Sequence, residues 1–431
     1  MTVTLEAGSG NYLSDRKTKR LFDEVCDGIF RQLRSLPVEE GRELLAQVRS
    51  TLQEEITAEQ SFQKEFGGLL EELLRVATPV ELARLHKGLV GVVTASFSRR
   101  ESIPAFHLLC TTILDSIVTQ ALRLAEEELK HSGVGAPPGY AWLVMGAAGR
   151  REATLSTDME SLLVHEPGPD AAKYCSRLAE RVAAILGECG VQKNGRGIMP
   201  DTPAWRASPE EWEERLEELC RRSGGTQSGS PALPGRRLGN IFSHRATTLN
   251  TPLFELADLR VVSGDAPLGG QLIALVRGAA ERHPACILKA AQTVTALPSP
   301  FSFLGNYRVE RSPPHRGCMD LNRLASLPLV SMVRLQAVTG GVAETGTLER
   351  IQQLLKRGTL DVELGKRLLQ GGIEIFRLMA QLEAREHAGV GDGAWLLPDT
   401  LPPSDENALR QALEAVATLQ KVIQSSLAQR V

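Results

Sequence analysis

One segment near the middle of the chain restricts the fold most. Over residues 140–165 an apolar run, a glycine-containing turn, a pair of acids and a second apolar run follow one another. The first apolar run leads into Gly146 and Gly149, and glycine lets a backbone turn tightly and approach a ligand closely. Asp158 and Glu160 stand directly before the second run. The segment therefore predicts two short strands of a small sheet, with the turn and both acids at its edge.

The spacing of the two acids determines where they point. Asp158 and Glu160 are two residues apart, so on an extended strand both side chains face one side and Met159 faces the other. At roughly 6 to 7 Å along the chain they can share one or two Mg²⁺ ions, which prefer carboxylate oxygens. The N–H groups of the glycine turn can lie beside a phosphate. A solvated strand end and a plain turn fit the same residues, so the pattern alone leaves both interpretations open.

Helical patterns flank this segment on both sides. Apolar residues at helical spacing predict helices near 61–76, 79–97 and 104–130, and a further stripe covers 21–33. Beyond residue 266 the pattern is helical almost throughout. We therefore predict an α+β fold, in which a small mixed sheet is flanked by an N-terminal helical region and a C-terminal helical bundle.

The length of the chain indicates more than one domain. A chain of 431 residues exceeds one ordinary domain, and 42% hydrophobic with 23% charged residues is typical of a globular protein. We predict an N-terminal helical region over 1–135, a core over 136–266 and a C-terminal helical domain over 267–431. Within the core, the Gly, Ser and Pro content of residues 222–235 predicts a surface loop.

Several functional classes are disfavoured by composition. A net charge of −3 gives no broad attraction to nucleic acid, and the seven cysteines form no Cys-x-x-Cys pair for a zinc ribbon. Walker A and Gly-x-Gly-x-x-Gly motifs are absent, which argues against a P-loop ATPase and a Rossmann dehydrogenase. The amino terminus has no apolar signal sequence, and the apolar runs are far shorter than a membrane span. We expect a cytoplasmic protein that binds neither nucleic acid nor membranes.

The central segment resembles the glycine-serine motif of the DNA polymerase beta-type nucleotidyltransferase superfamily. It is most similar to the nucleotidyltransferase family related to bacterial PII uridylyltransferase, which reads Gly-Ser-x-Gly-Arg-x-Glu and then Thr-Asp-x-Asp. The matching residues are Gly146, Gly149, Arg150, Glu152, Thr157 and Asp158. The segments at 197–205 and 254–265, and several motifs between 303 and 350, also resemble that family, so the similarity covers roughly residues 85 to 431.

This resemblance implies an enzyme that moves a nucleoside monophosphate group from an NTP to an acceptor and releases pyrophosphate. It implies two Mg²⁺ or Mn²⁺ ions held by the catalytic acids Asp158 and Glu160, and an Asp258 that completes the metal site and helps to deprotonate the acceptor hydroxyl. It also implies that the nucleotide is bound by Gly146, Ala147, Gly149, Arg150 and Arg151. For contacts with the acceptor it points to Arg260, Arg308, Arg311 and His315, although the last three also fit a solvated loop. The acceptor would be a small molecule or a protein, such as a signalling protein.

Two departures from the family pattern motivate a second hypothesis. Ala147 replaces the motif's serine, and the lost hydroxyl is worth about 1 to 3 kcal/mol where it would contact a desolvated phosphate. Glu160 replaces the second aspartate and is one methylene longer, whereas Mg²⁺ demands near-octahedral geometry. The alternative is therefore a nucleotide-sensing or regulatory interaction protein with weakened catalysis on the same fold. The N-terminal helices would form a homodimer, have a regulatory role or serve as a simple scaffold.

Asp258 also allows two interpretations. Phe254, Leu256, Asp258, Arg260 and Val262 are predicted to share one face of a strand, so the acid lies among apolar residues. An unpaired charge there is costly, and a cation must accompany it. That cation is either a metal ion or an arginine, with Arg260 or Arg150 as the partner in a site that holds no metal.

Overall fold

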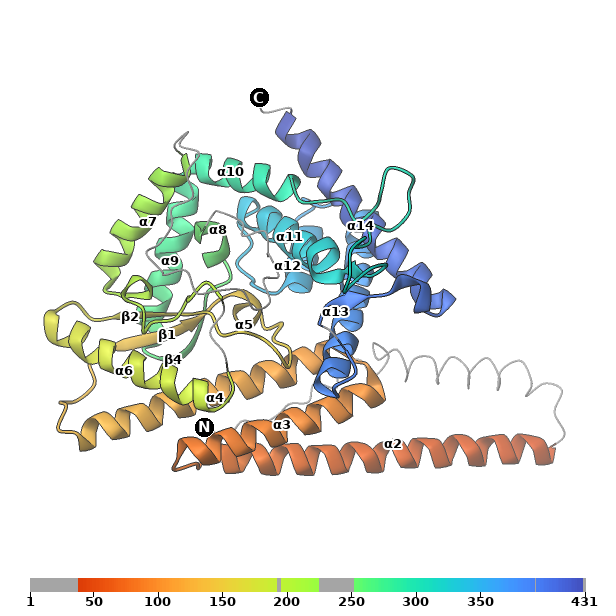
Figure 1. The fold of residues 1–431 in the computed structure, drawn as a ribbon, viewed down its shortest axis with the longest axis horizontal. Helices are drawn as coiled ribbons and strands as arrows, with labels where there is room; N and C mark the ends of the chain where they lie inside the picture. The colour runs from red at the N-terminus through yellow and green to blue at the C-terminus, as the bar shows by residue number, and fades with distance from the viewer. Residues whose placement is uncertain (1–37, 192–194, 225–251, 392, 429–431) are drawn as a thin grey trace.

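The computed structural model describes residues 38–191, 195–224, 252–391 and 393–428 of the chain. The predicted stripe over 21–33 and most of the predicted loop at 222–235 lie outside the described residues. The α+β prediction is confirmed, because a small mixed sheet lies between an N-terminal group of helices and a C-terminal helical bundle (Figure 1).

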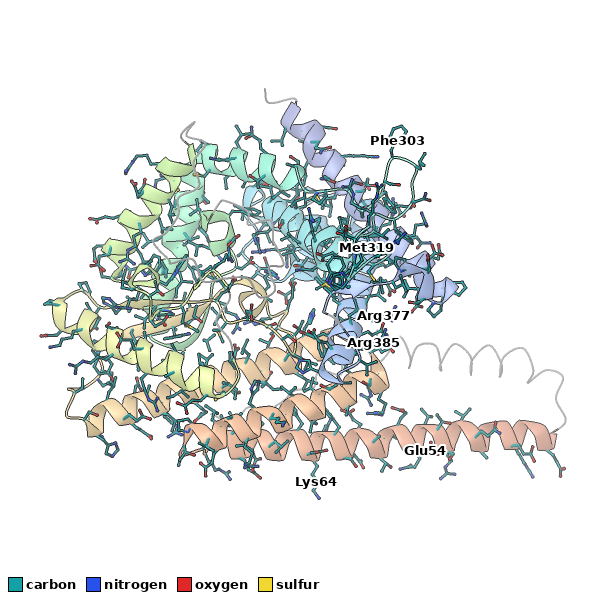
Figure 2. The ribbon with its side chains drawn as sticks, viewed as in Figure 1. Glu54, Lys64, Phe303, Met319, Arg377 and Arg385 are labelled. Carbon is teal, nitrogen blue, oxygen red and sulfur yellow. The ribbon has the colours of Figure 1, made fainter. Side chains whose placement is uncertain are left out.

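The N-terminal region consists of α2 (Val38–Leu73), α3 (Pro79–Arg100) and α4 (Ile103–His131), and α2 and α3 run alongside each other below the rest of the molecule (Figure 1). Helix α3 begins where the sequence signals a start: the Thr78 side chain accepts a hydrogen bond from the Glu81 N–H, and a proline follows directly. Figure 2 shows Lys64 pointing away from the body of the protein, on the face of α2 opposite α3.

Helix α4 agrees with the helix predicted over 104–130, and it is strongly apolar. Among the described residues, α4 is long and apolar enough to cross a membrane. However, 61% of its most apolar 18-residue stretch is buried inside the protein. It packs against α3 and against α6 (Pro169–Glu188). A helix that is apolar on nearly all sides is equally explained by burial in the core, and its packing here is that of a core helix.

Four strands form the central sheet: β1 (Tyr140–Val144), β2 (Ser161–His165), β3 (Arg206–Ala207) and β4 (Arg260–Gly264). Their order is β3-β2-β1-β4, with β1 antiparallel to both neighbours and β2 parallel to β3. Every residue of β1 and β2 is buried. Because both faces of these strands are covered, their sequences read as continuous apolar runs.

The two faces of the sheet belong to different hydrophobic clusters. Trp142 and Leu163 pack with α4 and α6, whereas Leu143 and Leu162 pack with α7 (Pro209–Gly224) and α9 (Ala266–Arg282). The short 3₁₀ turn η2 (Pro203–Trp205) precedes β3. The sheet is thus enclosed, and only its edges and strand ends can carry a site.

The predicted strand over 254–262 is wrong in its first half. Residues Pro252–Leu256 form a short helix, α8, and β4 begins only at Arg260. The Asp258 N–H donates to the Glu255 carbonyl, so the helical turn extends to that residue. A proline at the first position favours a helix start, and the alternation of Phe254 and Leu256 is too short to distinguish the two periods. Asp258 therefore lies in a turn rather than on a strand face.

The C-terminal region is a helical bundle, as predicted. Its helices are α10 (Pro284–Thr295), α11 (Leu327–Thr339), α12 (Thr347–Lys356), α13 (Val362–His387) and α14 (Pro403–Ala428). The remaining elements are a two-stranded sheet of β5 (Met319–Asp320) and β6 (Trp395–Leu396), the π-helical turn η3 (Asn322–Ser326) and the 3₁₀ turn η4 (Pro398–Thr400). In Figure 2 the fully buried Met319 lies inside this region, and Phe303 marks an exposed loop at its periphery. Helix α13 also contacts α3 and α4, so it joins the bundle to the N-terminal helices.

Candidate functional site

The glycine turn forms one helical turn, α5 (Gly146–Gly149), at the end of β1. Gly146 has φ of +62°, and a Cβ atom there would lie 2.4 Å from Oε2 of Glu160. A Cβ atom on Gly149 would lie 2.1 Å from the backbone oxygen of Asp258. Both positions therefore require glycine, and the turn is fitted closely between the second acid of the central segment and the Asp258 turn.

The two acids lie side by side directly before β2. Met159 is fully buried, Asp158 is exposed and Glu160 is half-buried, so the carboxylates face away from the core. The pKa of Asp158 is raised, first by its partial burial and then by the negative charge of Glu160. Two neighbouring carboxylates that face away from the core attract a cation, because a cation relieves the repulsion between their charges.

Glu160 already has a cationic partner, which the sequence did not reveal. Arg196 lies 2.5 Å from Oε1 of Glu160 and also pairs with Glu255 of α8. Burial raises the pKa of Glu255, although Arg196 opposes that effect. The guanidinium bridges two carboxylates, and its flanking residues, Gly195 and Gly197, gave no signal of this role.

Asp258 is held by three arginines rather than exposed to a metal site. Its carboxylate is fully buried and lies 2.8 Å from Arg150, 2.5 Å from Arg334 and 2.7 Å from Arg350. Burial would raise the pKa of Asp258, but the three guanidinium groups outweigh it and hold the pKa well below its usual range. We refer to Arg150, Arg334 and Arg350 as the arginine cluster.

The expectation that Asp258 completes a three-carboxylate metal site is therefore corrected. Both oxygens of Asp258 accept hydrogen bonds from the arginine cluster. In the described ranges no group of three or more His, Cys, Asp and Glu side chains could hold a metal ion. Of the two arginine partners considered, Arg150 pairs with Asp258, whereas Arg260 binds Asp115 of α4 at 2.7 and 2.8 Å.

Asp158 and Glu160 still fit one divalent cation. Mg²⁺ is commonly bound by one or two carboxylates together with the phosphates of a substrate. The adjacent pair provides those carboxylates, provided that Glu160 exchanges Arg196 for the ion. The donor set thus agrees with a single cation that arrives with a nucleotide and does not support a two-metal site that includes Asp258.

The arginines expected at the nucleotide have different surroundings. Arg150 lies between Glu152, at 2.6 Å, and Asp258, and only 12% of its side chain is exposed. Its charge is therefore committed to the interior. Arg151 is exposed beside the turn with φ of +56°, and Ala147 is half-buried. Of the two arginines, Arg151 is the one placed to meet a ligand from solvent.

The four residues expected to contact an acceptor do not form one cluster. Arg260 lies against α4, as described above. The His315 ring stacks on Trp395 of β6 with centroids 4.1 Å apart, and Arg308 and Arg311 are exposed on the loop that precedes β5. In Figure 2 that loop, marked by Phe303, lies across the bundle from the sheet.

A second contact missed in the sequence positions the loop that leads to Asp158. Glu383 of α13 accepts hydrogen bonds from the Thr154 hydroxyl and from the N–H groups of Leu155 and Ser156, at 2.9, 3.2 and 2.7 Å. His387, one turn further on, contacts the Ser156 hydroxyl at 3.0 Å. The spacing of two polar residues at the end of an apolar helix was visible, but nothing in it indicated a partner more than 220 positions away.

Comparison with protein families agrees with this two-part organisation. Residues 88–226 match the family described as "Putative nucleotidyltransferase DUF294", and residues 284–427 match the "Putative nucleotidyltransferase substrate binding domain". The chain carries both domains of this nucleotidyltransferase family. No curated protein matches the chain. The first domain contains the glycine turn, both acids and Arg196, and the second supplies Arg334, Arg350 and Glu383.

The match supports the general class, the transfer of a nucleoside monophosphate group, and it names no nucleotide or acceptor. A PII uridylyltransferase-like specificity is not part of either description. The domain boundaries at residues 135 and 266 stay predictions.

Proposed function

We propose that this DUF294 nucleotidyltransferase transfers a nucleoside monophosphate group from an NTP to an acceptor, with one divalent cation at Asp158 and Glu160. The observation that carries the proposal is the proximity of Asp158 to Glu160, whose carboxylate lies against Gly146, the close-fitting glycine at the end of β1. Cation ligands beside a backbone turn are what a metal-bound triphosphate requires.

The protein's own residues would bind and orient the nucleotide. The first N–H groups of a helical turn have no partner within that turn, so those of α5 are available to phosphate oxygens. Close packing of Gly149 against the Asp258 backbone fixes the direction of these groups. The cation, when bound, supplies positive charge that stabilises the leaving pyrophosphate.

The charges around Arg196 suggest that it also contacts the nucleotide once the cation binds Glu160. Glu160 and Glu255 carry two negative charges against the single charge of Arg196. When Glu160 turns to a cation, the guanidinium loses one partner and can donate to a phosphate oxygen, for which its planar fork is well suited. Arg196 would thus pass from a carboxylate to the nucleotide.

The second candidate is a nucleotide sensor that binds without turnover. It is favoured by the arginine cluster, which pairs with both oxygens of Asp258, and by Ala147, which lacks the hydroxyl of the family motif. Both differences weaken the chemical step and leave the turn and the acid pair in place.

Turnover with labelled nucleotides tests the proposal. The full-length protein is incubated with each of the four labelled NTPs and Mg²⁺ or Mn²⁺, and pyrophosphate and labelled products are measured. We expect pyrophosphate release that Asp158→Asn lowers at least about 100-fold, because the cation loses a ligand. Asp170→Asn, a change of an exposed acid on α6, is the matched control.

Two results would count against transferase activity. Turnover that Asp158→Asn leaves unchanged would show that the acid pair is not the site. Nucleotide binding measured by calorimetry, with no pyrophosphate from any NTP, would establish the sensor instead.

A further inference from the structure

A cavity of about 290 Å³ lies next to Asp158. Its wall combines four parts of the molecule: helices α3 and α4, the loop at 154–158, the segment after α6 at residues 190–191, and the end of α13. Asp158 therefore belongs both to the acid pair and to the lining of this cavity. A compound bound there would lie beside a nucleotide held at the acid pair.

His86 of α3 is a lining residue with a fixed orientation. Its Nδ1 lies 3.0 Å from the backbone oxygen of Cys189. A carbonyl oxygen can only accept, so Nδ1 carries the hydrogen, and in the neutral ring Nε2 then has a free lone pair. Burial lowers the pKa of His86, and the bond to Cys189 only partly opposes this, so the ring is neutral near pH 7.

The other titratable groups of the lining are less suited to accept a proton. His387 contacts Ser156, and burial raises the pKa of the Cys110 thiol far above neutrality. Asp158 is assigned to the cation. Asp258, which the family resemblance placed at the reaction centre, is enclosed by the arginine cluster. A proton acceptor must therefore come from another part of the molecule.

We propose that this cavity holds the acceptor, a small neutral or cationic hydroxyl compound, and that Nε2 of His86 is the general base that removes its proton. The inference rests on the proposed nucleotidyltransferase function. The acceptor oxygen forms a bond to the α-phosphorus, and the bond from that phosphorus to the β-phosphate oxygen breaks. Pyrophosphate leaves with the electron pair, and the proton moves from the acceptor hydroxyl to Nε2 and then to solvent.

The lining defines the class of acceptor. The described residues around the cavity include no lysine or arginine, so no such side chain would balance the charge of an anionic acceptor. Val90, Ile113 and Leu114 provide an apolar wall for a carbon skeleton. The volume suits a small molecule rather than a folded partner. The inference also gives the N-terminal helices a role, because α3 and α4 build the acceptor side of the site.

Two substitutions of His86 distinguish the role of Nδ1, the hydrogen bond to Cys189, from the role of Nε2, the proposed proton acceptor. His86→Asn can keep a donor for the Cys189 carbonyl but lacks the Nε2 lone pair, whereas His86→Gln places an amide near Nε2 and loses the anchor. His131→Asn is the matched control, because Nδ1 of this exposed histidine also lies close, at 2.6 Å, to a backbone carbonyl oxygen, that of Glu127. Glycerol serves as the probe acceptor, and its nucleotidyl product is measured by mass spectrometry from pH 5 to 8. Binding of a non-hydrolysable NTP analogue is followed by calorimetry.

We expect the wild-type rate to rise with pH through an inflection below about 6.5, the ordinary pKa of histidine. In His86→Asn the rate should fall about 100-fold and the inflection should disappear, because general base catalysis contributes about 10²- to 10⁴-fold. Affinity for the analogue should stay unchanged, and His131→Asn should behave as wild type. His86→Gln should also lose the inflection, with a similar loss of rate.

The outcomes separate this inference from the proposed function. If His86→Asn forms the glycerol product at the wild-type rate, or keeps the inflection, His86 is not the base while the transferase function stands. Pyrophosphate release by the wild type without any glycerol product would refute the acceptor cavity. If the wild type neither binds the analogue nor releases pyrophosphate, the proposed function itself fails.

Discussion

At the scale of single residues, Asp258 shows how a buried charge changes its role with its neighbours. A carboxylate that accepts hydrogen bonds from three guanidinium groups would have to exchange several of them before it could bind a metal ion. Such a group is a structural centre. Its removal leaves charged arginines in the interior, which costs more than the original pairing contributes.

The first prediction concerns the stability that Asp258 provides. Asp258→Asn should lower the free energy of unfolding by about 3 to 5 kcal/mol, since the arginine cluster then keeps only the carboxylate of Glu152. Urea denaturation followed by circular dichroism measures the change, with Asp170→Asn as the control for loss of one exposed acid. A loss below about 0.5 kcal/mol, the range of ordinary surface substitutions, would contradict a central structural role.

The second prediction is the pH dependence of that stability. The pKa of Asp258 in the folded protein is below its value of about 3.9 in an unfolded chain. The ionised carboxylate therefore stabilises the fold fully above about pH 4, and the contribution is lost as the pH falls from there toward the folded pKa. The difference in unfolding free energy between wild type and Asp258→Asn should shrink below pH 4. A difference that stays constant from pH 3 to 7 would refute this assignment.

At the scale of elements, α13 holds the loop that presents Asp158. Glu383→Ala removes the acceptor for two backbone N–H groups and one hydroxyl, and each hydrogen bond to a charged group is worth about 1.5 to 3 kcal/mol. We expect faster amide hydrogen exchange at Leu155 and Ser156, and a loss of about tenfold in cation-dependent turnover. Glu363→Ala, an exposed change in the first turn of the same helix, should alter neither. Unchanged exchange at Ser156 would show that the loop is held by other contacts.

The elements also show what a sequence can and cannot specify. Local patterns located α3, through the helical spacing of its apolar residues, and located β1 and β2 through their apolar runs. The strand before Asp258 was wrong because five residues starting at Pro252 satisfy both the helical and the extended pattern. Two of the three arginines that pair with Asp258 could not be predicted from the sequence. Arg334 and Arg350 are 76 and 92 positions away, and no periodicity connects residues at such distances.

At the scale of the whole molecule, the contacts around Asp258 join two domains into one unit. Arg334 and Arg350 reach it from α11 and α12, and Glu152 accepts hydrogen bonds from the N–H and the hydroxyl of Thr347 at the start of α12. If the sheet separated from the bundle, Asp258 and Glu152 would lose these partners, and their buried charges would be left uncompensated. Chains of several domains often unfold in steps, and these shared charges oppose that behaviour.

The last prediction is therefore a single cooperative unfolding transition. Tryptophan fluorescence reports mainly on the sheet domain, which contains Trp142, Trp205 and Trp212, whereas circular dichroism reports on helices throughout the chain. In the wild type both signals should change at the same urea concentration. In Arg350→Ala, Asp258 loses one partner from the bundle and the two transitions should separate, because the domains are then less strongly coupled. Arg357→Ala, an exposed change just beyond α12, is the control and should leave them coincident. Two distinct transitions in the wild type would show that the arginine cluster does not couple the domains.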